Sequence, residues 1–193
     1  MELSPAEIRV LGCLIEKQRA TPDSYPLTLN SLRLACNQTT GREPIVDYDE
    51  ATVREAAQRL GRLGLARYAS GHSGRVAKYR HLANEALGLG GGELALLAVL
   101  MLRGAQTPGE LKARTERLHR FEGLGGVLEG LETLVERGFA HVLGRRPGQK
   151  EQRYAHLLAS DEEREEPPGM PTLEQRVACL EREVRELRSL VQS

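Results

Sequence analysis

Apolar residues in the first third of the chain recur at intervals of three and four, the spacing that places them on one face of a helix. The first run follows Ser4-Pro5-Ala6-Glu7, which combines an N-cap, a proline at the first helical position and a capping-box glutamate. Thr28 and Asp49 would cap a second and a third helix, and Gly64 would end the third. The apolar positions of these helices are Ile8, Leu11, Leu14 and Ile15, then Leu29, Leu32 and Ala35, then Val53, Ala56, Ala57, Leu60 and Leu63.

A β-hairpin is predicted directly after the third helix. Residues 65–70 and 75–80 read as two short strands, and they flank the turn-forming stretch Gly71-His72-Ser73-Gly74. Strand residues alternate between faces, so pairing Ser70 with Arg75 would separate the tyrosines from the cations. One face would then hold Ala66, Tyr68, Ala77 and Tyr79, and the other Arg67 and Lys78.

The same order of elements recurs in the second half of the chain. Gly90-Gly91-Gly92 reads as a linker, residues 93–103 as an apolar helix closed by Gly104, and Thr107-Pro108-Gly109-Glu110 as a second capping box. A further helix ends at Gly138, and a second hairpin follows with Arg145-Arg146-Pro147-Gly148 near its tip. Three helices and a hairpin, twice, predict a mainly α fold with small β-hairpins (α+β), arranged as two tandem winged helix-turn-helix domains.

The last part of the chain has a different pattern. Acidic residues and prolines crowd residues 159–171, which predicts a solvated linker. Residues 172–193 then show a heptad pattern with Val at a and Leu at d, a choice that favours two strands. Either this helix forms a homodimer through Val177, Leu180, Val184 and Leu187, or it packs on its own chain. The predicted boundaries are therefore 1–85 and 86–158 for the winged helices, 159–171 for the linker and 172–193 for the heptad helix.

Composition and charge narrow the class of protein. Aromatic residues make up 4% of the chain and the formal net charge is zero, whereas a dedicated DNA-binding domain is usually basic. No apolar run is long enough to span a membrane, and the first ten residues lack the features of a signal peptide. Cys13, Cys36 and Cys179 are odd in number and far apart, which fits a reducing compartment. We therefore expect a cytoplasmic protein without a membrane partner.

No residue pattern indicates catalysis or a cofactor. The five histidines form no H-x-x-x-H motif and no Cys/His cluster of the kind that binds zinc. Gly90-Gly91-Gly92 lacks the lysine of a phosphate-binding loop. We therefore expect a non-enzyme that needs neither a metal nor a cofactor.

Basic and amide side chains mark a possible nucleic-acid surface. In the third predicted helix, Arg54, Gln58 and Arg62 lie opposite the apolar stripe, and Arg and Gln are side chains that read guanine and adenine edges. The hairpins add the cations Arg67, Arg75, Lys78 and Arg80, then Arg145, Arg146 and Lys150. The corresponding helix of the second half instead presents Glu129, Glu132 and Glu136, which would repel phosphates. The alternative interpretation is that these faces are ordinary solvated surface.

The chain also resembles a known group of sequences. Leu14-Ile15-Glu16-Lys17, the segment 21–30 (TPDSYPLTLN), Ala35-Cys36-Asn37-Gln38 and Arg42-Glu43-Pro44 resemble the bacterial YceH family, whose function is unassigned. The resemblance covers residues 1 to about 158 and the heptad tail. It implies a tandem winged-helix fold and no established activity. Thr39-Thr40-Gly41 departs from the Lys-Ser-Asn-like stretch usual in the family, so this loop lacks a positive charge.

The sequence leaves two functions open. The leading interpretation is a DNA-associated or regulatory protein that binds double-stranded DNA and forms a homodimer. The alternative is a protein–protein adaptor that uses winged helices as interaction modules. A long polar loop follows the second helix, and loops often bind partners. Its candidate partner surface is Tyr25, Asn37, Gln38 and Arg42.

Overall fold

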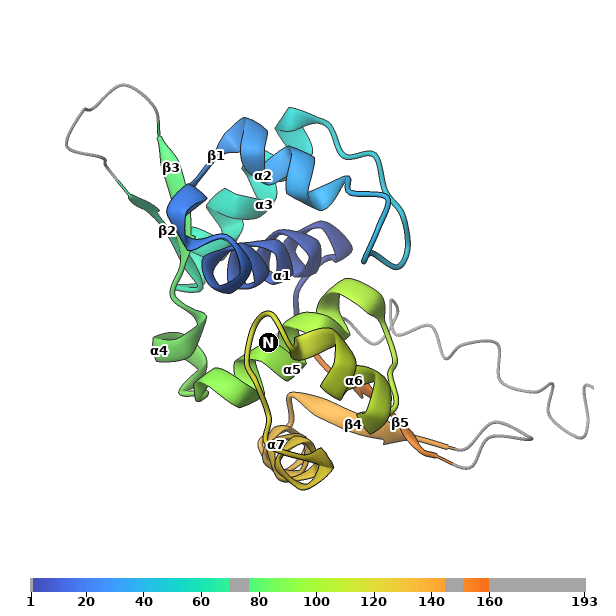
Figure 1. The fold of residues 1–193 in the computed structure, drawn as a ribbon. Helices are drawn as coiled ribbons and strands as arrows, with labels where there is room; N and C mark the ends of the chain where they lie inside the picture. The colour runs from blue at the N-terminus through green and yellow to red at the C-terminus, as the bar shows by residue number, and fades with distance from the viewer. Residues whose placement is uncertain (1, 70–76, 145–150, 160–193) are drawn as a thin grey trace, which may run out of the picture. The chain divides into compact units, whose positions relative to one another are not determined.

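The computed structural model describes residues 2–69, 77–144 and 151–159, and it combines helices with small antiparallel sheets (Figure 1). The predicted α+β class is confirmed at this level. In the first half the elements are α1 (Pro5–Ala20), a 3-10 turn (Pro22–Ser24), β1 (Leu27–Thr28), α2 (Leu29–Cys36), α3 (Glu50–Arg62), β2 (Ala66–Ala69) and β3 (Lys78–His81). The second half has α4 (Ala83–Leu87), α5 (Gly91–Arg103), α6 (Pro108–Thr115), α7 (Leu124–Glu136), β4 (Ala140–Leu143) and β5 (Arg153–His156). The tail residues Val177, Leu180, Val184 and Leu187 lie outside the described residues.

The helix starts are set by local capping. Ser4 Oγ accepts a hydrogen bond from the backbone of Glu7, and the Glu7 carboxylate accepts one from the backbone of Ser4. Thr107 and Glu110 form the same reciprocal pair at the start of α6. Thr28 caps α2 and Asp49 caps α3. These side chains satisfy backbone N–H groups that have no partner inside the helix, and each such cap stabilises a helix by about 1 kcal/mol.

The glycine run before α5 is part of the helix, so the predicted linker at residues 90–92 is wrong. Gly90 is the N-cap, and α5 already includes Gly91 and Gly92. A Cβ added to Gly92 would lie 3.2 Å from the Phe121 ring and 3.4 Å from the His119 ring. The loop after α6 therefore packs closely on the first turn of α5, and the glycines leave room for it.

Two small antiparallel sheets accompany the described helices. The first has the order β1-β3-β2, because β1 adds to the predicted hairpin by pairing Leu27 with Tyr79. Tyr68 lies opposite Tyr79, which differs by two residues from the register that pairs Ser70 with Arg75. A shift of two residues leaves every side chain on its predicted face. In the second half β4 pairs with β5, and a single bridge between Gln106 and Tyr154 occupies the place of β1.

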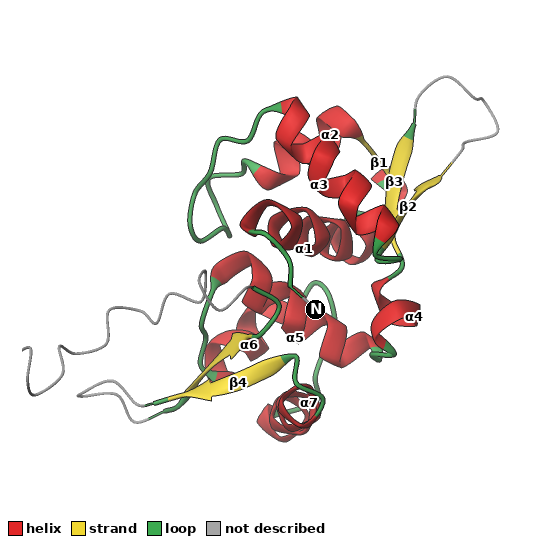
Figure 2. Ribbon diagram, turned by 180° about the vertical axis from the view of Figure 1, so that it is seen from behind, coloured by secondary structure: helices red, strands yellow, loops and turns green. Residues whose placement is uncertain are grey.

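The core is centred on two helices, α1 and α5, which pack against each other. Figure 2 shows them side by side, with α2 and α3 beyond α1 and with α6 and α7 beyond α5. A Cβ added to Gly12 of α1 would lie only 2.9 Å from the buried Leu102 side chain, so the glycine permits this close approach. Leu3 also bridges to Ala159, joining the two ends of this region. The described residues all belong to one compact unit.

The α1–α5 contact predicts a specific stability change. Gly12→Ala should lower the free energy of unfolding by about 1–3 kcal/mol, because the new methyl group overlaps a side chain that has no room to move. Gly61→Ala is the matched control: its Cβ would meet only the Ala66 carbonyl oxygen at 3.7 Å, and alanine favours helix more than glycine. Urea unfolding followed by circular dichroism should show opposite changes. Equal midpoints for the two variants would contradict the proposed close packing.

Candidate nucleic-acid interface

Helix α3 presents a long exposed face beside the apolar stripe that it buries. Val53, Ala56, Ala57 and Leu60 are buried as predicted, whereas Leu63 at the end of the helix is 42% exposed. The predicted side chains Arg54, Gln58 and Arg62 are all exposed. The structure does not gather the three in one place, because Arg54 lines a groove on one flank of α3 and the other two line a groove on the opposite flank. The helix is therefore a ridge between two grooves.

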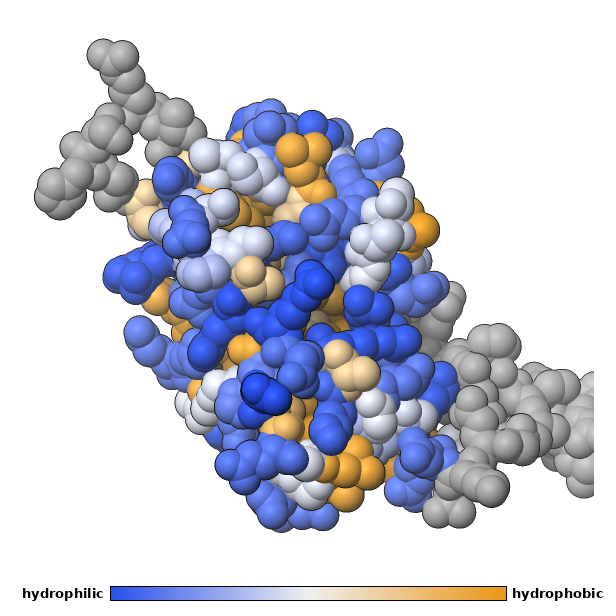
Figure 3. Space-filling model, viewed as in Figure 1, coloured by the Kyte–Doolittle hydropathy of each residue, from blue (hydrophilic) through white to orange (hydrophobic). Residues whose placement is uncertain are grey.

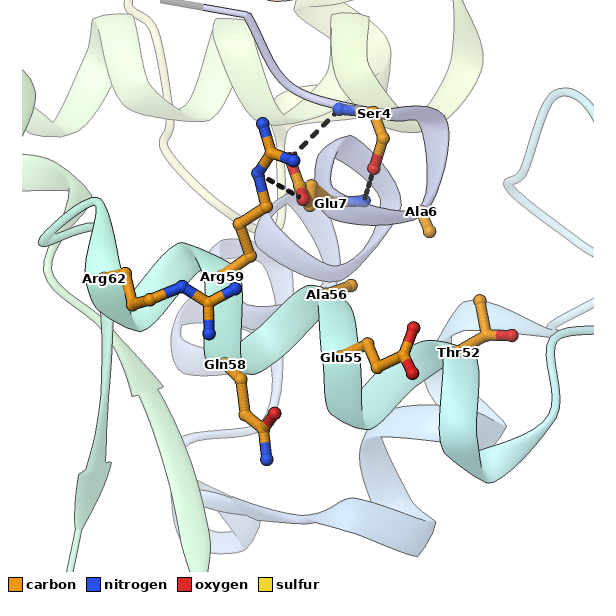
Figure 4. A pocket seen from close by; sticks show the side chains of 9 residues that line it. All are labelled: Ser4, Ala6, Glu7, Thr52, Glu55, Ala56, Gln58, Arg59 and Arg62. Carbon is orange, nitrogen blue, oxygen red and sulfur yellow. Dashed lines mark hydrogen bonds and ion pairs between the residues drawn. The ribbon is translucent and has the colours of Figure 1, made fainter.

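The first groove, here called the α1–α3 groove, has a volume of about 340 Å³ (Figure 4). The buried carboxylate of Glu7 forms its floor and pairs with Arg59, with Nε and Oε1 3.1 Å apart. Gln58 points away from α1 in Figure 4, and neither Gln58 nor Arg62 has a side-chain partner among the described residues. The groove is lined by Ser4, Ala6, Glu7, Thr52, Glu55, Ala56, Gln58, Arg59 and Arg62. Within the described part of the chain Arg62 is thus a cation without an ion-pair partner, whereas the charge of Arg59 is offset by Glu7.

The second groove, here called the hairpin–α3 groove, has a volume of about 500 Å³ and lies between α2, α3 and the β2–β3 hairpin. Arg54 forms an ion pair with Glu50 one turn earlier in α3, so its charge is partly neutralised. Tyr68, which is 51% exposed, lies against Tyr79 with ring centroids 4.8 Å apart. Burial and the neighbouring Tyr68 raise the pKa of Tyr79 to about 12. The groove therefore combines a cation with an accessible aromatic ring.

The outer face of the β2–β3 hairpin gathers further cations. Arg67 lies opposite Arg80, and Lys78 follows on the same face. Arg67 is exposed, while Lys78 and Arg80 are half-buried. Arg75, Arg145, Arg146 and Lys150 lie outside the described residues, so the structure places only part of the predicted set.

Hydrogen bonds and an ion pair hold the loop after α2 against the rest of the protein. Arg42 is buried, contrary to the expectation that it belongs to an exposed partner surface. Its guanidinium pairs with Glu16 at 2.6 Å and donates to the Ala35 carbonyl at 3.1 Å. Burial is the largest single effect on the pKa of Arg42 and lowers it, but the hydrogen bond to Glu16 and the charge interactions with Glu16 and the two nearby thiols together raise the pKa above its ordinary value. Gln38 accepts a hydrogen bond from Arg42, and Asn37 bonds to both backbone groups of Tyr48. These residues determine the loop conformation and, through it, the start of α3.

Tyr25 and His81 link the hairpin to α1. The backbone N–H of His81 donates to the Tyr25 hydroxyl at 2.7 Å, and burial raises the pKa of Tyr25 to about 12. His81 Nδ1 accepts from the Ala83 backbone, so Nε2 carries the proton and donates to Gln18 Oε1 at 2.8 Å. Burial, with Arg19 and Arg80 nearby, lowers the pKa of His81 to about 4. The ring is therefore neutral where it positions β3.

This cluster predicts a pH-dependent stability. The pKa of His81 is about 4 in the folded protein and 6.5 in the unfolded chain, so only the unfolded chain takes up a proton between these values. The contribution of His81 to the free energy of unfolding is therefore fully present above pH 6.5. It is lost as the pH falls from 6.5 to about 4, by at most about 3 kcal/mol. His81→Gln should flatten the pH dependence of the urea midpoint between pH 6.5 and 4, whereas His119→Gln, outside the cluster, should not. An unchanged slope in His81→Gln would contradict a neutral, buried His81.

The second half repeats the geometry with different side chains. Helices α3 and α7 each have 13 residues and are followed by a glycine with positive φ, Gly64 and Gly138, and then by a strand. Glu50 and Arg54 correspond to Leu124 and Leu128, and Tyr68 corresponds to Val142, which lies opposite the buried Tyr154. The positions of Gln58 and Arg62 hold Glu132 and Glu136. The cationic face of the first half therefore has an apolar and acidic counterpart.

The described residues were also considered for a metal site and a membrane-spanning helix because either would change the class of the protein. In the part of the chain that the structure describes, no three His, Cys, Asp or Glu side chains gather in a way that could hold a metal ion. None of the described helices is both long and apolar enough to cross a membrane. Cys13 and Cys36 are buried free thiols.

Comparison with known proteins gives the family of the chain. It is 48% identical over 193 residues to a UPF0502 protein of Solibacter usitatus, covering 97% of this chain and 93% of the relative. It is 43% identical over 205 residues to a UPF0502 protein of Serratia proteamaculans, covering 100% of this chain and 95% of the relative. The resemblance to the YceH group agrees with these matches. A family model described as "Protein of unknown function, DUF480" matches residues 3–149, and the chain belongs to this family.

Proposed function

We propose that residues 2–159 hold two winged helix-turn-helix modules and that the first module binds double-stranded DNA. The order of three helices and a hairpin in each half, with α3 and α7 in the place of recognition helices, supports the fold. The observation that supports the function most is the exposed ridge of α3, where neither Gln58 nor Arg62 has a side-chain partner among the described residues, together with the cationic outer face of the hairpin. An exposed helical ridge of this kind can enter the major groove of the duplex.

The two sets of residues would have different roles. Gln58 and Arg62 lie on the ridge, where amide and guanidinium groups can reach base edges in the major groove. Arg67 and Lys78 lie on the hairpin, where their charges can contact phosphates and orient the module without reading sequence. Arg54 must leave its pairing with Glu50 to contribute, so we expect less from it than from Arg62. Because these contacts are ionic and release counterions from the DNA, binding should weaken as the salt concentration rises.

The binding proposal is tested by fluorescence anisotropy with labelled duplex DNA at several salt concentrations. Arg54→Glu with Arg62→Glu should weaken binding at low salt by about tenfold or more, because two attractive charges become repulsive. Arg117→Glu with Arg120→Glu makes the same change in net charge at exposed positions of the second half and is the matched control. Equal weakening by both variants would show that net charge alone, and not α3, governs binding.

The adaptor remains the second candidate, and the apolar and acidic face of α7 favours it. The two functions differ in what a pull-down from lysate retains after nuclease treatment. Partners that disappear with nuclease support DNA binding by the first module. Partners that persist, together with no anisotropy change at low salt, would replace the DNA proposal with the adaptor.

We also propose a homodimer formed by the heptad pattern of residues 172–193. Leu180→Glu with Leu187→Glu places charges at d positions, where each would be buried without a partner, and should convert the full-length protein to a monomer. Light scattering with size-exclusion chromatography measures this directly. Ser189→Glu, outside the a and d positions, is the control and should keep the wild-type mass. A wild-type protein that is already monomeric would rule out the dimer.

A further inference from the structure

The exposed face of α7 is more apolar than the corresponding face of α3. Leu124, Leu128 and Val142 are 42%, 36% and 42% exposed, and they replace the three residues Glu50, Arg54 and Tyr68 of the hairpin–α3 groove. Helix α7 packs on β4, so the leucines and the valine belong to adjoining elements. Figure 3 shows apolar surface around α7 at the lower edge of the view. Exposed leucine and valine at three corresponding positions form an apolar patch, here called the α7 patch.

The rim of the α7 patch is acidic. Glu129, Glu132 and Glu136 are exposed along the same helix, and none has an ion-pair partner among the described residues. The neighbouring cation, Arg137, forms no ion pair with them among the described residues, because its guanidinium is held by the carbonyls of Gly88 and Leu87 at 2.7 and 2.6 Å. It also covers the Phe139 ring. The negative charge of the rim is therefore available to a partner.

We propose that the α7 patch binds a basic amphipathic helix of a protein partner. An apolar stripe on that helix would cover Leu124, Leu128 and Val142, and lysine or arginine beside the stripe would pair with the acidic rim. Duplex DNA does not fit this face, since phosphates would meet three carboxylates. A second copy joined patch to patch does not fit either, because symmetry would set the acidic rims against each other. The partner is thus a protein segment that carries apolar and basic residues on one helical face.

The probe is a labelled synthetic helix with leucine at alternating three- and four-residue spacing and lysine at the flanking positions, compared with the same peptide carrying glutamate instead of lysine. Fluorescence anisotropy with the full-length protein should show that the lysine peptide binds and that the glutamate peptide does not. Leu124→Ser with Leu128→Ser should lower the affinity for the lysine peptide by about tenfold. Leu34→Ser with Ile45→Ser is the matched control, since these side chains are more exposed, at 56% and 63%, and lie in the first half.

A charge reversal keeps the test decisive if the serine variant unfolds. Glu132→Lys with Glu136→Lys alters only exposed positions. This variant should bind the lysine peptide with lower affinity than the wild type, and it should bind the glutamate peptide. Equal binding of both peptides to the wild-type protein would overturn the proposal, and so would an α7 variant that binds like the wild type. The assay contains no DNA, so its failure leaves the DNA proposal untouched, and a failed DNA assay leaves this one standing.

Discussion

The rest of the structure depends on the packing of α1 against α5. Both helices bury residues on nearly every side, because α1 also supports α2 and α3 and α5 also supports α6 and α7. Gly12 lets the two backbones approach until Leu102 fills the space where a Cβ would be. A mostly aliphatic core with few aromatics suits such close packing of helices. The two similar halves thus share one core and act as one body, unlike two domains on a tether.

On this shared body, the two halves differ mainly at a few exposed positions. Buried positions of α3 and α7 are similar in character, since Val53 and Leu60 correspond to Val127 and Leu134. The exposed positions diverge, with Arg62 in one half and Glu136 in the other. Buried positions of the two halves resemble each other because their side chains must pack in a core, whereas surface side chains can change at little cost in stability. One repeat can therefore favour phosphates while the other favours apolar and basic partners.

Much of the fold could be predicted because its signals are local. A capping box needs only residues three apart, and Ser4 with Glu7 confirms it. Contacts between distant segments give no such signal. The burial of Arg42 depends on Glu16, and the pairing of Arg59 with Glu7 depends on how α3 crosses α1. Gly91 and Gly92 belong to α5, and Phe121 packs where Gly92 has no side chain, although glycine alone suggests a linker.

The candidate site was predictable in part for the same reason. Helical spacing correctly placed Arg54, Gln58 and Arg62 on the exposed side of α3. It could not show that Glu50 neutralises Arg54, or that two grooves separate these side chains. The apolar character of the α7 patch becomes visible only when β4 is placed beside α7 and the halves are compared position by position. Charge along one helix is readable from sequence, whereas a surface formed by two elements is not.

We propose that the two halves offer different surfaces and that duplex DNA contacts only the first. Backbone hydrogen exchange of the full-length protein, measured with and without duplex DNA at low salt, tests this most directly. We expect added protection in residues 50–62 and 66–81 and unchanged exchange in residues 124–136. Protection of residues 124–136 by DNA, or exchange that DNA leaves unchanged throughout residues 50–81, would contradict it.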